Sequence, residues 1–241
     1  MGSSVSIVIP TKNRAELLKR SLASAVNQTL PAIEIIVADN NSTDETKEVI
    51  ESFNDSKIVH LHIDQDLPMM PNWFRGIEAS RGEWVKILAD DDWLEDNFLE
   101  KTVAEITDDR VMIHTGGIVH TLGSDENYDL EPVSSEQPFH KVFMKEIRGG
   151  ILATLVKRSA LDYAIEIMPQ LDSICLESNF GPDIVLMAAA TTQADTSWLH
   201  IPEALVHYEG REGSLTIDIK NQNPGLIDMC YIKTIDFLAR L

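Results

Sequence analysis

The sequence predicts an α/β protein in which helices flank one mostly parallel central sheet, within a single domain spanning residues 1–241. Three observations favour this fold class. Over the first 115 residues, short apolar segments alternate with segments of helical period. Polar clusters follow three of the apolar segments, as expected where parallel strands end at one edge of a sheet. The composition, 44% hydrophobic and 24% charged, is that of a folded protein, and neither a repeat nor a linker divides the chain.

The first half of the chain, residues 1–115, is expected to hold four strands with helices between them. Asn13 and Glu16 have the spacing of a capping box before the first helix, and Ser42 and Glu45 have it before the second. The expected strands are 5–10, 34–38, 58–63 and 84–88. One expected helix begins after Asn13, a second ends at Phe53, and two more cover 72–80 and 98–106.

The second half, residues 116–241, is less regular. Segment 123–138 is acidic and poor in apolar residues, which predicts a surface loop or a lid. The expected strands are 111–120, 151–156, 197–201 and 204–208; the expected helices are 140–148, 160–168, 183–190 and the terminal 226–241.

The charge balance excludes some classes of partner. Lys and Arg number 20 against 39 Asp and Glu, a net charge of −19, which argues against nucleic acids and against adhesion to an anionic membrane surface. Cys175 and Cys230 have no zinc-binding spacing and favour a reducing, cytoplasmic setting. No apolar run is long enough for an integral membrane segment, and nothing in the sequence fixes an oligomeric state.

Three acidic features are candidates for chemistry. Asp90, Asp91 and Asp92 directly follow an apolar strand, where their mutual repulsion would be relieved by Mn²⁺ or Mg²⁺; the alternative is an acidic turn that caps a helix. Asp39 ends another strand and would either accept a hydrogen bond from a nucleobase or form a turn. Asp183 begins an apolar helix and would be either a general base or a first-turn carboxylate favoured by the helix dipole.

Several common motifs are missing from the sequence. No GxGxxG, GxxxxGK[ST] or GxSxG is present, which disfavours dinucleotide-binding oxidoreductases, P-loop NTPases and α/β-hydrolases. The seven histidines are scattered, so none of them is expected to be a ligand.

Two stretches together resemble the signature of family 2 glycosyltransferases with the GT-A fold. They are VSIVIPTKNRAELLKRSLASAVNQTLPAIEIIVADNNSTDET at 5–46 and GIEASRGEWVKILADDDWL at 76–94. The similarity continues more weakly through RGGILATLVKRSAL, FGPDIVL and ALVHYEGREGSLT. The resemblance implies a Rossmann-like GT-A sheet with a nucleotide-sugar half at about 1–115 and an acceptor half at about 116–241.

The resemblance also implies roles for individual residues. Asp183 would be the catalytic base, Asp92 would bind the Mn²⁺ or Mg²⁺ cofactor, and Gly149 and Gly150 would border the acceptor. Contacts to the nucleotide sugar would come from Pro10, Thr11, Asn13, Arg14, Asp39, Asn41, Arg75, Arg81, Asp90, Asp91 and Arg211, with Asp39 at the base.

Two positions depart from the family pattern. Many members carry Asp where Ala89 stands, so either Asp90 substitutes in part or one contact to the metal or the ribose is lost. Arg211 stands where many members carry a His near the diphosphate. A permanent guanidinium there would contact the diphosphate directly and weaken the dependence on a metal.

The function implied by the resemblance is inverting transfer of a sugar from a nucleoside diphosphate sugar, UDP or dTDP favoured, to a hydroxyl of a glycan or lipid-linked glycan. Such a hexosyltransferase would serve polysaccharide biosynthesis, and a lipid-linked acceptor would bring it to a membrane surface. The alternatives are a degenerate family member that binds a nucleotide sugar or a partner without turnover, and a nucleotidyltransferase. The second lacks its Gly-rich loop here.

Overall fold

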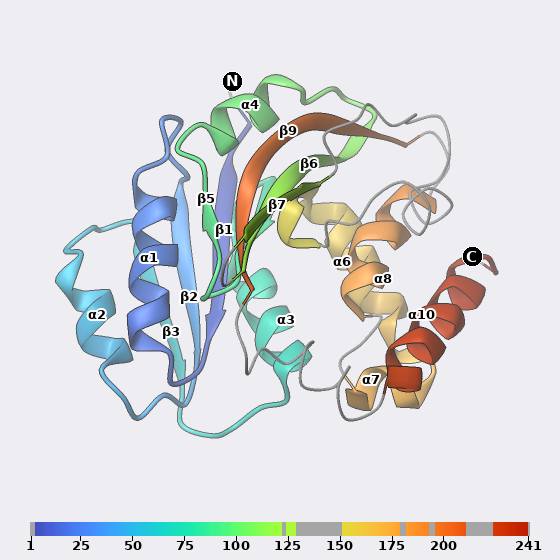
Figure 1. Ribbon diagram of the computed structural model, residues 1–241, viewed down its shortest axis with the longest axis horizontal. Helices are drawn as coiled ribbons and strands as arrows, with labels where there is room; N and C mark the ends of the chain where they lie inside the picture. The colour runs from blue at the N-terminus through green and yellow to red at the C-terminus, as the bar shows by residue number, and fades with distance from the viewer. Residues whose placement is uncertain are drawn as a thin grey trace.

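The computed structural model describes residues 3–121, 124–128, 151–178, 182–192, 196–210 and 224–240. One curved, mostly parallel sheet runs through the centre of this part of the chain, with helices on both of its faces (Figure 1). The predicted fold class is therefore confirmed. The strands are β1 (Val5–Thr11), β2 (Glu34–Asn40), β3 (Ile58–Ile63), β4 (Trp84–Ile87), β5 (Trp93–Leu94), β6 (Arg110–Thr121), β7 (Ser124–Tyr128), β8 (Thr154–Lys157) and β9 (Ser197–Gly210).

The strand order is β3-β2-β1-β4-β8-β6-β9-β5, and β7 pairs with β6. The first four strands of this order are parallel, and so are β6 and β9. Because β1, β2 and β4 are buried along their whole length, their sequences are nearly continuous apolar runs. The carboxyl ends of β1, β2 and β4 therefore lie along one edge of the sheet.

Two hydrophobic clusters cover the two faces of the sheet. Apolar residues of α1 (Ala15–Val26), α2 (Thr46–Ser52) and α4 (Phe98–Ala104) pack on one face. On the other face pack α3 (Met69–Ala79), α6 (Arg158–Ile167), α7 (Ser173–Ser178), α8 (Pro182–Ala188) and α10 (Pro224–Leu238), with three short 3₁₀ turns at Ile151–Ala153, Met168–Gln170 and Ala189–Thr192.

Gly76 lets α3 approach the sheet closely. A Cβ at this position would lie 2.5 Å from Cγ1 of Val8 and 3.2 Å from Cβ of Ala38. Val8 and Ala38 belong to β1 and β2, whose ends carry much of the candidate site, so this contact sets the position of α3 behind it.

The second half differs from expectation in four places. β9 is one long strand rather than two, because Pro202 and Glu203 form a bulge opposite Thr115 and Gly116 of β6. The expected strand at 151–156 begins as a 3₁₀ turn, and α7 was not expected; in the first half, the two-residue strand β5 was not expected either. Part of the expected loop at 123–138 is strand β7, paired with β6. The expected helix at 140–148 lies outside the described residues.

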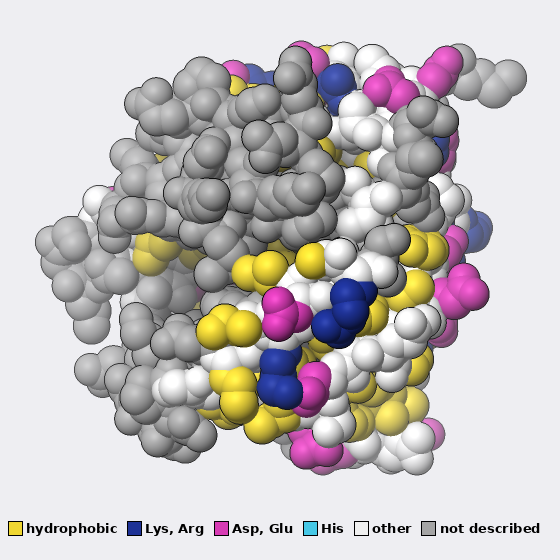
Figure 2. All heavy atoms as spheres, turned by 90° about the vertical axis from the view of Figure 1, so that its right-hand side faces the viewer, with side chains coloured by type: hydrophobic (Ala, Val, Ile, Leu, Met, Phe, Trp, Pro, Cys, Tyr) yellow, Lys and Arg dark blue, Asp and Glu magenta, His cyan; other side chains and the backbone are white. Residues whose placement is uncertain are grey.

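No described helix is both long and apolar enough to cross a bilayer. Figure 2 shows the face on the side of α10, where acidic and basic side chains lie next to one another among hydrophobic ones. One ion pair joins Lys233 of α10 to Asp172, just before α7.

Candidate active site

The end of β1, the start of α1 and the loop after β4 meet around Asp90. Thr11 Oγ1 donates to Oδ2 of Asp90 at 2.8 Å, and Arg14 Nη1 donates to Oδ1 of Asp90 at 2.9 Å. The same Arg14 nitrogen lies 3.3 Å from Oδ2 of Asp91. Four of the expected nucleotide-sugar residues are thus connected in one chain of contacts, Thr11–Asp90–Arg14–Asp91. Each carboxylate oxygen of Asp90 accepts one of these hydrogen bonds, so Asp90 anchors the side chain of Arg14.

Asp92 is buried with little compensation of its charge. The residue is 5% exposed, and its Oδ1 accepts a hydrogen bond of 3.0 Å from the backbone N–H of Glu209 in β9. Burial, assisted by the negative charge of Asp91, raises the pKa of Asp92 to about 7. Burial also raises the pKa of Asp90, against the effect of Arg14. Burial makes ionisation of these carboxyl groups costly, and a divalent cation bound beside them would offset that cost. Hard cations such as Mn²⁺ and Mg²⁺ prefer carboxylate oxygens as ligands.

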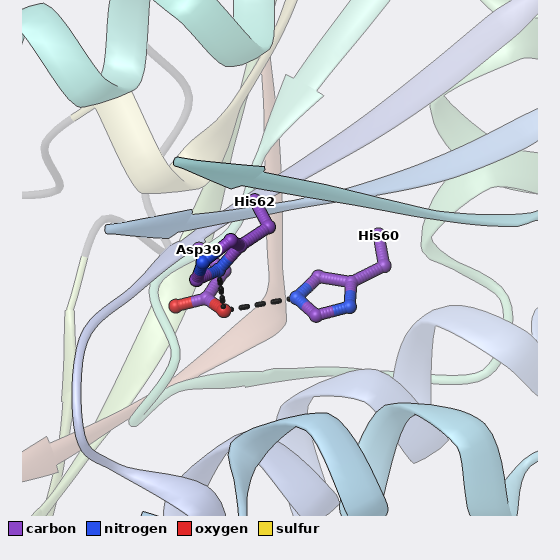
Figure 3. Close-up of side chains that lie close together, drawn as sticks. All are labelled: Asp39, His60 and His62. Atoms are coloured by element: carbon purple, nitrogen blue, oxygen red, sulfur yellow. Dashed lines mark hydrogen bonds and ion pairs between the residues drawn. The ribbon is translucent and has the colours of Figure 1, made fainter. Parts of the chain in front are cut away.

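Asp39 forms the second group, at the end of β2. It is 2% exposed, and its Oδ1 accepts a hydrogen bond of 3.0 Å from the backbone N–H of Ser42. Nε2 of His60 and Nδ1 of His62 each lie 2.9 Å from Oδ2 (Figure 3). Burial disfavours the charged form, but the hydrogen bonds from Ser42, His60 and His62 outweigh burial and lower the pKa of Asp39 to about 2. Asp39 is therefore an ionised acceptor.

Arg75 holds the backbone beside Asp39. Its Nη2 donates to the carbonyl oxygens of Asp39 and Leu61 at 3.0 and 3.1 Å, and its Nη1 donates to that of His62 at 3.1 Å. Arg75 thus fixes the ends of β2 and β3 relative to α3. The structure places it next to the group expected to bind the base.

The loops after β1 and β2 are tied to each other. Asn13 and Asn41 adopt positive φ values of 51° and 57°, which Asn tolerates better than most residues. The backbone N–H of Asn13 donates to Ser42 Oγ at 2.9 Å, and that of Thr43 donates to Asn13 Oδ1 at 2.7 Å. Asn41 Nδ2 donates to Asp66 Oδ1 at 3.1 Å. Both asparagines therefore shape the loops of the site.

The two expected capping boxes are wrong. In neither α1 nor α2 does a backbone N–H of the first turn donate to the side chain of the N-cap residue. Asp44 serves both helices instead: Oδ2 accepts from the N–H of Ala15 at 3.0 Å, and Oδ1 accepts from the N–H of Thr46 at 3.1 Å. The cause is tertiary, since the acceptor for α1 comes from the loop after β2.

The remaining expected residues are more dispersed. Pro10 is buried in β1, paired with Ala38. Arg81 is not brought to the group, because its Nε donates at 2.9 Å to Oε2 of Glu34, at the opposite end of β2 from Asp39. Asp183 lies in the first turn of α8. The three other expected residues, Gly149, Gly150 and Arg211, lie outside the described part of the chain.

Sequence reasoning missed Arg20, which lies on α1 like an ordinary surface residue. Its Nη2 donates to the carbonyl oxygen of Asp91 at 2.8 Å and to Oε2 of Glu209 at 2.6 Å. Its guanidinium carbon lies 3.7 Å from the centre of the Trp93 ring. Arg20 thereby joins the acidic loop to the end of β9. Its partner Glu209 is 189 residues away in the chain, so no local pattern could have found this contact.

Sequence reasoning also missed Lys86, although a lysine within an apolar strand is a visible signal. Lys86 is fully buried, donates to the carbonyl oxygen of Leu152, and lies 4.5 Å from the Phe98 ring centre. Burial lowers the pKa of Lys86 to about 7, against the opposing effect of the Asp92 charge.

Comparison with solved structures supports the GT-A architecture. The structure of S. aureus TarS 1–349 in complex with UDP-GlcNAc superposes with a TM-score of 0.68 at 14% identity, covering 95% of this chain and 66% of that chain. At 14% sequence identity, the similarity establishes a shared fold and nothing further.

Comparison with curated and family sequences identifies the relatives. The putative glycosyltransferase EpsH of Bacillus subtilis is 27% identical over 168 residues, 66% of this chain and 48% of that protein. GalNAc(5)-diNAcBac-PP-undecaprenol beta-1,3-glucosyltransferase of Campylobacter jejuni is 37% identical over 93 residues, 37% of this chain and 30% of that protein. The chain thus spans less than half the length of these two relatives. The model of glycosyl transferase family 2 matches residues 6–157, more than half of the chain, and the chain therefore belongs to that family.

Proposed function

We propose that this protein is an inverting glycosyltransferase that transfers a sugar from a nucleoside diphosphate sugar to a hydroxyl of a glycan or lipid-linked glycan. The observation that carries the proposal is the pairing of two acidic groups at one edge of a family 2 fold. Asp39 is the last residue but one of β2, and Asp91 and Asp92 follow β4, with β1 between the two strands. Two strand spacings separate β2 from β4 by about 10 Å. A nucleoside diphosphate is long enough to reach from one to the other.

The donor would lie along this edge. Asp39 is an ionised acceptor suited to the N3–H of uracil or thymine, which favours UDP or dTDP. Thr11, Arg14 and Asp91 would contact the ribose and diphosphate. The TarS structures with UDP-GlcNAc and with UDP support a uridine donor by analogy of fold. The undecaprenol in the name of the Campylobacter relative supports a lipid-linked acceptor.

The chemistry would be a single displacement. Asp183 would take the proton of the acceptor hydroxyl as its oxygen attacks the anomeric carbon from the face opposite the leaving diphosphate. The first turn of α8 favours the ionised form that a base needs. Asp92 would hold a divalent cation, which supplies positive charge to the leaving diphosphate when bound. Arg14 adds a fixed cation beside Asp91. Arg211, which the sequence places in the family position near the diphosphate, lies outside the described residues.

A thermal-shift panel tests the donor. UDP, dTDP, GDP, CDP and ADP are each added with and without Mn²⁺. A nucleotide at 100 times its Kd adds about 2.7 kcal/mol, or roughly 5–10 °C for a chain of this size. We expect UDP or dTDP to stand out with Mn²⁺ and Asp39→Asn to lose that shift, while Asp55→Asn, in a loop before β3, keeps it. The absence of a shift from every nucleotide would contradict the proposal.

Asp183→Asn tests the base. We expect unchanged nucleotide binding and a transfer rate lower by about 10²–10⁴-fold, the usual contribution of a general base. Product configuration at the anomeric carbon, read by NMR, is expected to be inverted. A variant with wild-type turnover would remove Asp183 from the mechanism, and a retained configuration would exclude the single displacement.

A further inference from the structure

Asp39, His60 and His62 bring three side chains of metal-binding type together on two adjacent strands (Figure 3). His62 is the cross-strand partner of Asp39. His60 lies two residues earlier on β3, so all three side chains share one face of the sheet. One ligand atom from each residue lies within 4.8 Å of the other two.

We propose that these three residues form a binding site for a transition-metal ion of the Zn²⁺ class, separate from the divalent cation expected at Asp92. Two imidazoles and one carboxylate are donors that Zn²⁺ takes, at bond lengths of about 2.0–2.2 Å. Ligands at those lengths around a tetrahedral ion lie roughly 3.3 Å apart. The ring nitrogens of His60 and His62 lie 2.9 Å from Oδ2 of Asp39. Around a bound ion each of these two nitrogen–oxygen distances would widen by a few tenths of an ångström, and the ligand atoms of His60 and His62, which lie within 4.8 Å of each other, would complete the triangle of ligands.

The ligands are held in place by their neighbours. The second carboxylate oxygen of Asp39 is fixed by the N–H of Ser42. Nε2 of His62 lies 3.3 Å from Oδ1 of Asp64, so the nitrogen that does not face Asp39 has a carboxylate partner of its own. Such carboxylate–imidazole pairs orient metal-binding histidines and set their tautomer. Arg75 directs Nη donors to the backbone carbonyl oxygens of Asp39, Leu61 and His62 and so holds both strand ends.

The site is open on one side. The Asp39 side chain is 2% exposed, whereas those of His60 and His62 are 23% and 40% exposed. Three protein ligands with a solvent-facing side leave a fourth position for water or an added ligand, as in zinc sites that remain reactive.

The chemistry of the ligands separates this site from the one at Asp92. Imidazole nitrogens suit Zn²⁺, Co²⁺, Ni²⁺ and Cu²⁺, whereas Mg²⁺ and Mn²⁺ prefer oxygen ligands such as the carboxylate of Asp92. Strand β1 lies between β2 and β4, so two strand spacings, about 10 Å, separate the strands that lead to the two sites. Asp39 belongs to both proposals: an ion on Oδ2 would leave Oδ1, which accepts from the N–H of Ser42, to receive the base. The inference itself concerns binding of the ion in the absence of nucleotide.

Titration of the metal-free full chain with Co²⁺ tests the proposal without any nucleotide, so its failure is distinct from failure of the proposed function. Four-coordinate Co²⁺ absorbs visible light far more intensely than the six-coordinate aqueous ion. We expect the intense absorption band to appear and to saturate at one equivalent of Co²⁺. Added Zn²⁺ is expected to displace the bound Co²⁺, and added Mg²⁺ is not. His60→Ala and His62→Ala are each expected to weaken binding at least 10-fold.

Two matched variants serve as controls. Asp92→Asn removes the proposed ligand of the other site, and His120→Ala removes a histidine on β6; both are expected to bind Co²⁺ like the wild type. His62→Gln keeps a polar side chain should the alanine variant fail to fold. The proposal is overturned if the wild type gives no intense band, if both histidine variants bind as the wild type does, or if Asp92→Asn abolishes binding.

Discussion

Lys86 places an ammonium group inside the protein, and this has a measurable consequence for stability. Its pKa falls from 10.5 to about 7 because the residue is buried. Between these two values the unfolded chain binds more protons than the folded one, so stability rises with pH across that window. For this group the rise is about 2 kcal/mol between pH 7 and pH 9.

We expect Lys86→Met to remove this rise. The measurement is urea unfolding of the metal-free protein at pH 7, 8 and 9, with Lys101→Met on α4 as a partly exposed lysine control that keeps the wild-type slope. The comparison of slopes is independent of any constant cost from the lost hydrogen bond to Leu152. Equal slopes for Lys86→Met and the wild type would mean that Lys86 is charged in the folded protein at pH 9.

At the same scale, the sequence predicted much of the candidate site but not how its residues are connected. Asp39 and the three acids after β4 were recognisable because each carboxylate ends an apolar run. His60 and His62 were dismissed because histidines two residues apart carry no signal until β3 pairs with β2. Arg81 was misplaced because a basic residue near a strand start does not reveal that Glu34 will bind it.

At the scale of elements, Asp44 stabilises two helices with one carboxylate. Its oxygens accept from the first turn of α1 and from Thr46 at the start of α2. Hydrogen bonding, against a burial effect of opposite sign, lowers the pKa of Asp44, so its contribution is present above the unfolded pKa and is lost as pH falls through the folded one.

We expect Asp44→Ala to cost about 1–2 kcal/mol for each cap, and to lower Tm by several degrees. Glu16→Ala is the discriminating control, because the capping box expected from the sequence would make Glu16 important, whereas the structure gives α1 no side-chain cap at its N-cap residue. A larger loss for Glu16→Ala than for Asp44→Ala, measured by calorimetry at pH 7, would restore the capping box.

The predicted helices and strands match the structure where the sequence signal was local. The third strand has the predicted bounds, Ile58–Ile63, because apolar and polar residues alternate between clear turn signals. Strand β5 is only two residues long and exists through its pairing with Val206 and His207, more than a hundred residues later. Strand β9 was divided in two because Pro202 predicts a break, whereas the sheet accommodates it in a bulge.

At the scale of the whole molecule, net charge sets the response to salt. A chain of 241 residues with a net charge of −19 repels itself in the compact state. Salt also weakens attractive surface ion pairs such as Lys47–Glu51 and Lys233–Asp172, which acts in the opposite direction on stability. Exposed pairs of this kind contribute only about 0–1 kcal/mol each. Relief of repulsion should therefore dominate when salt is added.

We expect the urea midpoint to rise when NaCl increases from about 10 mM to about 300 mM, because the Debye length falls well below the dimensions of the molecule. Specific binding of Na⁺ at the acidic loop would give the same sign, so Asp92→Asn and choline chloride are needed as controls. Repulsion predicts the same rise with choline and in the variant. A rise that needs Na⁺ and is lost in Asp92→Asn would instead assign the salt effect to a cation held at the end of β4.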